Sequence, residues 1–395
     1  MMSQKGVNLE EISKRAQDIP PFIAMDVLET AQAMERSGES IIHLEVGEPD
    51  FDTPECINEA AIKALRDGKT HYTDSRGLLE LREAICAHYY QQYLVNISPD
   101  QVIVTSGTSP AMLIVFLALL EPGQEVIISD PYYACYPNFI QFAQGKPVKV
   151  QVFEEDGFQF FPQEIEKRVG PKTKAIFINS PSNPTGTLLS ADRMRELSRY
   201  RPYIVSDEIY HGLVYEGQEH SILEFTDRAF VLNGFSKLYA MTGWRLGYLI
   251  APREFIRPLQ KIHQNFFISA NSVSQWAGIA ALTQARDEVA RMREIYDQRR
   301  KVMIRRLKSL GFGLAVEPTG AFYVLANARR FHPNSYQLAF DILKEAKVGV
   351  TPGIDFGSGA EGYLRFTYAN SVERIEEAMD HLRVYLSRET YKKIS

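Results

Sequence analysis

Cysteine is scarce in this chain, which has three cysteines in 395 residues. Cys56, Cys86 and Cys135 are odd in number and lie far apart. They therefore have neither the paired spacing of a zinc site nor the density of a disulfide framework. This usage is typical of a protein kept in a reducing compartment.

A long apolar run and an excess of positive charge are also missing. The longest apolar run, at 111–120, is too short to span a bilayer, and the first residues lack the basic and then apolar pattern of a signal peptide. With 44 Lys and Arg against 49 Asp and Glu, the net charge of -5 offers no basic surface for nucleic acid or an anionic membrane. We expect a cytoplasmic protein whose partners are small molecules, with no nucleic acid and no membrane among them.

The sequence does have enough apolar side chains for a sizeable core, because 45% of its residues are hydrophobic. From about residue 100 to 250, short β-branched runs end in polar or glycine-rich turns, and helical patterns separate several of them. This alternation predicts an α/β domain whose mostly parallel sheet is covered on both faces. The expected strands are 101–107, 125–130, 174–180, 203–208, 229–236 and 247–252.

The segments on either side have a different pattern. A helix and then a strand are expected within 20–44, and a long charged helix follows residue 285. Strands alternate with helices from there onward, which is typical of an α+β domain. We predict a large domain over 46–285, a smaller α+β domain over 286–395, and an N-terminal segment, 1–45, that joins the smaller domain. The cleft between the domains is the expected ligand site.

Chemically active side chains follow five of the expected strands. In open α/β sheets, ligands bind beyond the carboxyl ends of the strands, so these side chains should meet at one edge. They are the SGTS turn at 106–109, the pair Tyr132 and Tyr133, Asn183, Asp207 with Tyr210, and Ser236 with Lys237.

The SGTS turn suits an anion. Gly107, Thr108 and Ser109 lie between a strand and an apolar helix, where backbone amides and hydroxyls can hold a phosphate. Ser236 and Arg245 could add a hydroxyl and a permanent positive charge to the same site. Each feature alone also fits a structural role, the turn as a helix cap and the arginine as half of a surface ion pair.

Lys237 and Asp207 predict a particular chemistry. A lysine at the end of an apolar strand and near Arg245 should have a lowered pKa, which frees its amine to attack an aldehyde. The alternative is a lysine whose chain reaches solvent at the rim of the sheet. Asp207 could pair with a protonated ring nitrogen, or it could cap a helix.

Three further side chains complete the partners of one ligand. Tyr210 and Asn183 could donate hydrogen bonds to a phenolic oxygen, and Tyr133 offers a ring for stacking. A pyridine ring that carries an aldehyde, a phenolic oxygen, a basic nitrogen and a phosphate is pyridoxal 5'-phosphate (PLP). We therefore predict PLP as the cofactor and Lys237, Asp207 and Tyr210 as catalytic residues, with Lys237 as the imine-forming and proton-transfer group.

A substrate carboxylate needs a planar cation that binds it through two nitrogens. Arg365 is the candidate, because it lies on an expected strand of the smaller domain that could close over the cleft. An ion pair within that domain is the alternative for this arginine.

Together these motifs resemble those of the class I/II aminotransferases of fold type I, in the subgroup that includes many bacterial aspartate and aromatic aminotransferases. The resemblance runs over nearly the whole chain and includes the order and spacing of the site residues from Asn183 to Arg365. Its motifs are VGEPDFDTP at 46–54, HYTDSRGLLELREAI at 71–85, TSGTSPA at 105–111, DPYYACYP at 130–137, NSPSNPTG at 179–186, SDEIYHGLVYEG at 206–217, SKLYAMTGWRLGY at 236–248, GAFY at 320–323, PGIDFG at 352–357 and LRFTYA at 364–369.

The resemblance implies an enzyme that moves an amino group between an L-amino acid and a 2-oxo acid by a ping-pong mechanism. It also implies a homodimer with shared active sites, in which Tyr72 of a second subunit joins the phosphate site. Gly47 and Asn183 would lie near the substrate carboxylate held by Arg365. The segment 263–272 contains no Arg or Lys that could bind a distal carboxylate, and its aromatic residues hint at an apolar side-chain pocket.

Other functions stay open on the sequence alone. The same chemistry supports β-elimination on cysteine-type substrates, and Lys237 does not distinguish the two reactions. A PLP-binding transcription regulator would carry an appended DNA-binding domain, whereas about 45 residues precede VGEPDF and show no helix-turn-helix pattern. The complete set of site residues argues against an inactive relative.

Overall fold

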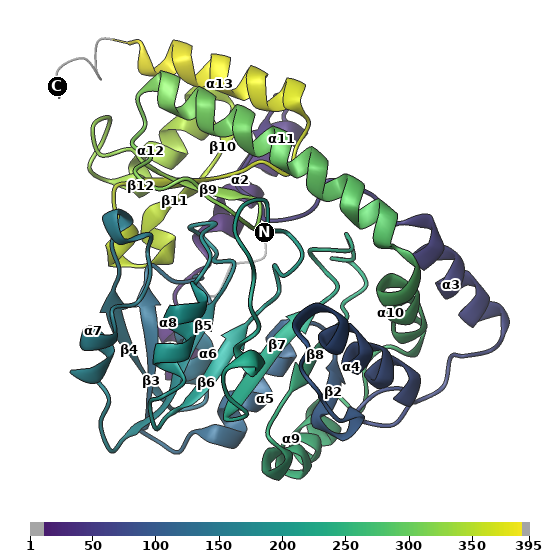
Figure 1. Cartoon of the computed structure of the whole chain (residues 1–395). Helices are drawn as coiled ribbons and strands as arrows, with labels where there is room; N and C mark the ends of the chain where they lie inside the picture. Colours follow the sequence, from purple (N-terminus) through teal and green to yellow (C-terminus); the bar gives the residue numbers. More distant parts are fainter. Residues whose placement is uncertain (1–11, 389–395) are drawn as a thin grey trace, which may run out of the picture.

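The structure is a computed structural model that describes residues 12–388. At its centre is a seven-stranded sheet in the order β2-β8-β7-β6-β5-β3-β4 (Figure 1). The pairs from β7 across to β4 are parallel, whereas β8 runs antiparallel to both of its neighbours. The strands are β2 (Val102–Thr105), β3 (Glu125–Asp130), β4 (Lys146–Gln151), β5 (Thr173–Asn179), β6 (Tyr203–Asp207), β7 (Ala229–Gly234) and β8 (Gly247–Ile250).

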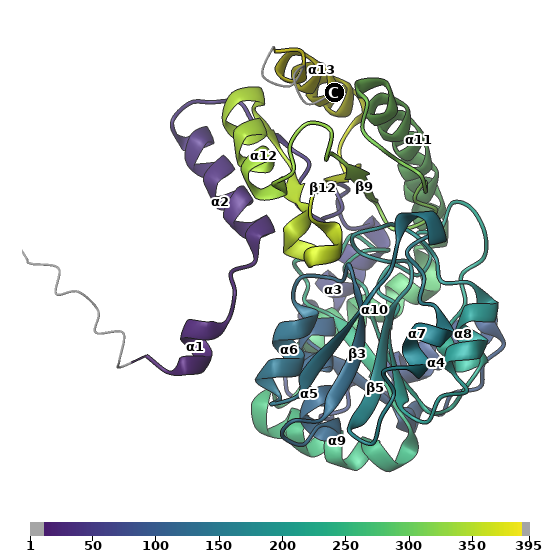
Figure 2. The same cartoon turned by 90° about the vertical axis from the view of Figure 1, so that its left-hand side faces the viewer.

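Helices cover both faces of this sheet, because most of its strands carry apolar residues on both sides. On one face, Ile103, Phe177 and Leu232 pack with α5 (Thr108–Leu119), α6 (Tyr136–Phe142) and α9 (Arg253–Phe266). On the other face, Val104 and Ile204 belong to a second cluster, and Figure 2 shows the two layers edge on. The helices of that second layer are α3 (Glu55–Arg66), α4 (Leu79–Tyr93), α7 (Pro162–Glu166), α8 (Ala191–Leu197) and α10 (Ser272–Gln284).

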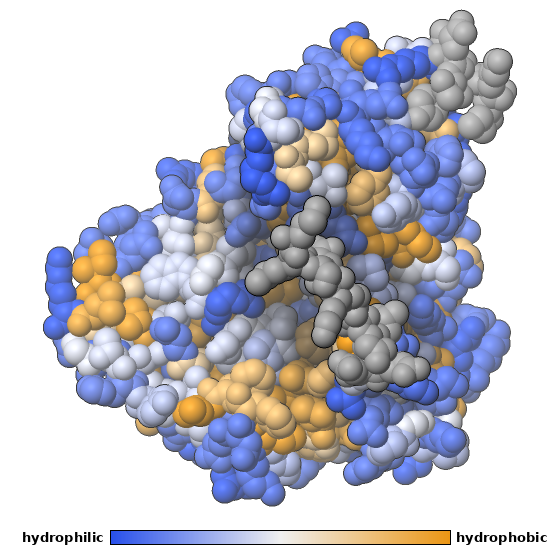
Figure 3. Space-filling view, turned by 180° about the vertical axis from the view of Figure 1, so that it is seen from behind, coloured by the Kyte–Doolittle hydropathy of each residue, from blue (hydrophilic) through white to orange (hydrophobic). Residues whose placement is uncertain are grey.

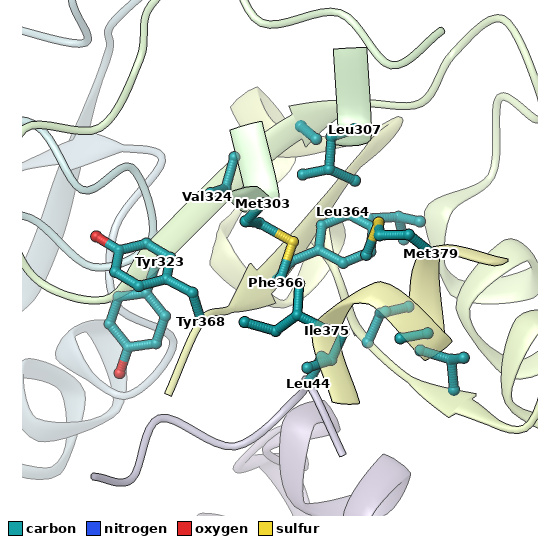
Figure 4. Packing of buried hydrophobic residues seen from close by; sticks show 14 of the residues in the cluster. Leu44, Met303, Leu307, Tyr323, Val324, Leu364, Phe366, Tyr368, Ile375 and Met379 are labelled. Carbon is teal, nitrogen blue, oxygen red and sulfur yellow. The ribbon is translucent and has the colours of Figure 1, made fainter. Parts of the chain in front are cut away.

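The smaller domain is built on a three-stranded antiparallel sheet in the order β11-β12-β9. In its hydrophobic core, Met303, Phe366 and Met379 belong to one buried cluster. The hydroxyls of Tyr323 and Tyr368 point away from the aliphatic middle of this cluster (Figure 4). Its elements are α11 (Arg286–Leu310), β9 (Tyr323–Asn327), α12 (Ser335–Asp341), β11 (Thr351–Pro352), β12 (Tyr363–Thr367) and α13 (Val372–Leu386).

The N-terminal segment packs on elements from the last third of the chain. After α1 (Lys14–Asp18) and α2 (Ile23–Arg36), strand β1 (Ile42–His43) pairs in parallel with β10 (Val348–Gly349). Figure 2 shows α2 beside α12. The domain boundaries that we place after residues 45 and 285 stay predictions.

The α/β fold with a smaller α+β domain is confirmed, and the six expected strands are all present. Strand β4 was not expected, because it is an edge strand with a proline, two lysines and one fully buried residue. The charged helix α11 ends at Gly311, whose φ of 91° lies in the left-handed region that glycine favours. Among residues 12–388, no helix is long and apolar enough to cross a membrane.

Candidate active site

A cavity of about 310 Å³ lies at the carboxyl ends of the large sheet, under residues of the smaller domain. Most of the predicted site residues line it, including Asp207 and Lys237 from the large domain and Arg365 from the smaller one. The others that line it are Gly47, Thr108, Ser109, Tyr133, Asn183, Tyr210, Ser236 and Arg245. Two predicted residues do not, since Gly107 lies against Arg245 and Tyr72 is 82% exposed on the surface.

Lys237 lies just after β7, with its amine inside the cavity. Its Nζ donates a hydrogen bond to the backbone oxygen of Gly47 at 2.6 Å. Burial lowers the pKa of this amine from 10.5 to about 8, with Arg365 and Arg245 lowering it further and Glu48 opposing them. Near pH 8, the Lys237 amine is therefore uncharged, and able to act as a nucleophile, in a large fraction of the molecules.

Asp207 ends β6 and is 5% exposed. Its Oδ2 accepts a hydrogen bond from Tyr136 Oη at 2.8 Å, and its Oδ1 accepts one from the amide of Ile209 at 3.2 Å. Burial raises the pKa of this carboxyl from 3.8 to about 6, and the two hydrogen bonds oppose the rise. The sequence reasoning missed Tyr136, although it stands in the same PYYACYP motif as Tyr133.

Arg365 lies on β12 and is 2% exposed. Its Nη1 donates to Asn183 Oδ1 at 2.9 Å, and its Nη2 donates to the backbone oxygen of Glu45 and to Thr351 Oγ1. Within residues 12–388, no carboxylate lies within 4.0 Å of its guanidinium nitrogens, and Nε is buried with no partner. An ion pair inside the smaller domain, the alternative for Arg365, is therefore absent from the described part of the chain.

A pair of tyrosines joins the two domains beside Arg365. The hydroxyls of Tyr210 and Tyr323 lie 2.8 Å apart, and the Tyr323 ring is 4.5 Å from the Arg365 guanidinium carbon. A side chain at Gly47 would place its Cβ 1.8 Å from Tyr323 Oη, so glycine is needed there for the tyrosine to reach this position. Tyr323 was not predicted, and its one signal was the GAFY motif at 320–323.

The other end of the cavity suits a phosphate. Helix α5 begins at Thr108 with Gly107 as its N-cap, at a φ of 99°. A Cβ at Gly107 would lie 2.8 Å from Arg245 Nη2, and one at Gly247 would lie 2.8 Å from the carbonyl carbon of Gly107. These close approaches bring helix amides and a guanidinium to one point. Arg245 is exposed, and its hydrogen bond within residues 12–388 goes to the Thr242 oxygen at 3.0 Å, not to a carboxylate.

The residues present fit PLP at every functional group that this cofactor carries. Arg245 and the amides of α5 face the phosphate end, and the ionisable Asp207 and the amine of Lys237 line the same cavity. The buried and uncompensated cation Arg365 leaves a place for a carboxylate, as an amino-acid substrate requires.

Comparisons with known proteins agree with this geometry. A family model for class I and II aminotransferases matches residues 39–382. A (5-formylfuran-3-yl)methyl phosphate transaminase of Methanocaldococcus jannaschii is 42% identical over 95% of this chain and 100% of its own. The aspartate/prephenate aminotransferase of Thermus thermophilus is 38% identical over 95% of this chain and 99% of its own.

Solved structures give the same result. The Thermus thermophilus aspartate aminotransferase with maleate matches with a TM-score of 0.91 at 37% identity, over 94% of this chain and 99% of its own. A Methanococcus jannaschii protein, described as similar in its active site to kynurenine aminotransferases, matches with a TM-score of 0.88 at 43% identity. The match covers 95% of this chain and 100% of that protein's chain. These relatives do not favour the β-lyase alternative. The chain belongs to the class I and II aminotransferases, PLP-dependent enzymes that move an amino group between an amino acid and a 2-oxo acid.

Proposed function

We propose that the cavity under Arg365 is the transaminase active site, in which Arg365 binds the substrate carboxylate and Lys237 moves the substrate proton. The observation that carries this proposal is the burial of Arg365 without a carboxylate within 4.0 Å in residues 12–388. A desolvated guanidinium is stable only with hydrogen bonds and a counter-charge, and its planar fork matches a carboxylate. Gly47 and Asn183 stand beside that place.

When bound, PLP supplies an aldehyde that condenses with amines and a ring that accepts the electron pair left at the substrate α-carbon. Lys237 Nζ would hold that aldehyde, and as a free amine it would carry the proton away from the substrate α-carbon, which its lowered pKa permits near pH 8. The Gly47 oxygen orients Nζ by accepting its hydrogen bond.

The remaining residues position the cofactor. Asp207, with its pKa of about 6, is ionised at pH 8 and binds a protonated ring nitrogen, while Tyr136 fixes the direction of its Oδ2. Tyr210 and Asn183 donate to the phenolic oxygen, and Tyr133 stacks on the ring. The phosphate lies with Gly107, Thr108, Ser109, Ser236 and Arg245, joined by Tyr72 of the partner subunit.

We further propose substrates with uncharged side chains. The cations that line the cavity in residues 12–388 are Lys237, Arg245 and Arg365, and each has a place in the roles above. Phe22 and other apolar residues line the rest of the cavity. The segment 263–272 does not line this cavity, and Phe266 in it is 68% exposed.

A homodimer in the cytoplasm completes the proposal. Tyr72 is an aromatic residue that is 82% exposed, and Phe266 and Ile268 are exposed as well, as expected of residues that a second copy covers. Figure 3 shows broad apolar patches on the face seen from behind. The three cysteines, none of them in a disulfide, fit a reducing compartment.

The test follows the absorbance of the holoenzyme as single amino acids are added, together with oxo-acid formation. We expect conversion to the pyridoxamine form, and Arg365→Lys should raise KM for the amino acid about tenfold or more while PLP binding is unchanged. Lys237→Ala should keep phosphate-anchored PLP and lose the imine absorbance. Pyruvate and ammonia without the pyridoxamine form would instead indicate β-elimination, and equal loss of PLP and substrate binding in Arg365→Lys would reject its role.

A further inference from the structure

A second cavity, of about 600 Å³, lies on the face of the large sheet that α4 and α10 cover. It is about twice as large as the active-site cavity and within the usual range of small-molecule sites, about 300–1,000 Å³. Its walls are α4, the end of α10, the first two turns of α11 and the turn that follows β6. None of the predicted site residues lines it.

Helix α11 presents one face to this cavity. Arg286, Val289, Ala290 and Arg293 line it, at the spacing that places residues on one side of a helix. Within residues 12–388, neither arginine side chain makes a hydrogen bond or has a carboxylate within 4.0 Å. Both residues are exposed, and their guanidinium groups stand on one wall of the cavity without a partner in the described chain.

Among the lining residues one carboxylate stands against two arginines, so their positive charge is not balanced. Glu219 is the carboxylate among the lining residues, and it already accepts hydrogen bonds from the amide of Gly212 at 2.7 Å and from Tyr93 Oη at 3.2 Å. Burial lowers the pKa of His88 to about 4, with Glu219 opposing the shift, so His88 is uncharged at neutral pH. The wall of α11 therefore attracts an anion.

The inner end of the cavity is aromatic and holds one unsatisfied group. Phe235, Tyr239 and Tyr248 line it. His211 is 5% exposed, its Nδ1 lies 2.7 Å from Tyr93 Oη, and its Nε2 is buried with no partner among residues 12–388. Buried polar atoms without partners are uncommon in folded proteins and need an explanation.

We propose that this cavity is a second ligand site, which takes a small organic anion. Arg286 and Arg293 bind its carboxylate or phosphate group, and the aromatic end packs against an apolar or aromatic body. The two cavities are linked by a short stretch of chain, because Asp207 at the end of β6 lines the active-site cavity and His211 in the turn that follows lines the second. The proposal does not rest on the roles assigned to Lys237 or Arg365.

The test is calorimetric titration of the PLP-loaded enzyme with two probes, phenyl phosphate and 3-phenylpropionate. We expect one or both to bind at a site, separate from any binding at Arg365, that the double variant Arg286→Ser/Arg293→Ser weakens by roughly tenfold or more. Arg291→Ser is the matched control, since Arg291 is exposed on the same helix and does not line the cavity. Turnover of the amino-acid substrate should not change in either variant.

The relative affinity of the two probes tells whether the site prefers a phosphate or a carboxylate. No binding by either probe would overturn the proposal. A titration that the double variant leaves unchanged would also overturn it, because all of the binding would then take place elsewhere, such as at the Arg365 site.

Discussion

Removing the hydroxyl that Tyr136 donates to Asp207 should raise the pKa of this buried carboxyl. The hydrogen bond spans 2.8 Å and is the strongest of the contacts that oppose the raised pKa of Asp207. Hydrogen bonds to charged groups contribute about 1.5–3 kcal/mol, which at 1.36 kcal/mol per pKa unit corresponds to a rise of about one to two units in Tyr136→Phe. The carboxylate would then be partly protonated near neutral pH.

The sign of the effect on stability follows from linkage. A carboxyl whose pKa is higher in the folded than in the unfolded state binds its proton more tightly when folded, so stability falls as pH rises from about 4 through the folded pKa. Tyr136→Phe extends that fall to higher pH. Urea unfolding of the apoenzyme should therefore show the variant losing about 1.5–3 kcal/mol more than wild type between pH 5 and pH 9.

Tyr132→Phe is the matched control for this measurement. Tyr132 lies on the loop that leads into α6 and is buried, but its hydroxyl accepts a hydrogen bond from Lys149 Nζ at 2.8 Å and does not contact Asp207. The stability that the Tyr132→Phe variant loses relative to wild type should be the same at pH 5 and pH 9. A loss in Tyr136→Phe that is the same at both pH values, or equally pH-dependent in Tyr132→Phe, would refute the reasoning.

Three further changes follow from the contacts around the cavity. Gly47→Ala should destabilise the enzyme by roughly 1–3 kcal/mol, because the new Cβ meets Tyr323 Oη, and Tyr323→Phe should restore part of this in a double-mutant cycle by urea unfolding. The hydrogen bond that His43 donates to Glu45 raises the pKa of His43 to about 9, so this pair should stabilise the fold fully below about pH 6.5 and lose its effect as pH rises through 9. His43→Gln should accordingly lower Tm at pH 6.5 and leave it unchanged at pH 10. Phe22→Ala should raise KM for phenylalanine several-fold and leave KM for alanine unchanged in steady-state assays, and equal effects on both would contradict an apolar side-chain pocket at Phe22.

The positions of Lys237 and Asp207 were predictable because each directly follows an apolar strand. The carboxyl ends of parallel strands meet at one edge, so the local pattern of each segment was enough to bring them together. Tyr136 and Tyr323 were not predictable in this way. Their partners Asp207 and Tyr210 lie 71 and 113 residues away, and nothing in the local sequence of either tyrosine distinguishes a hydroxyl that faces the site from one that faces the core.

The same limit applies to β4 and to the direction of β8. The segment 146–151 alternates poorly between apolar and polar residues because it forms an edge of the sheet, so its strand pattern is weak. β8 has the buried, apolar pattern of its neighbours, and such a pattern does not carry the direction of a strand. Its antiparallel pairing comes from the path of the chain after Lys237.

Helix α11 shows why the sequence could not indicate the second cavity. Its arginines look alike along the sequence, yet Arg299 pairs with Asp50 at 2.7 Å and Arg300 pairs with Asp297 at 2.8 Å. Arg286 and Arg293 have no such partner in residues 12–388, because the part of α11 that carries them faces a cavity in place of a packed surface. Which charges of a helix stay uncompensated depends on what the fold places opposite them. Two arginines without partners on the wall of one cavity are therefore evidence for a ligand that the sequence pattern alone does not provide.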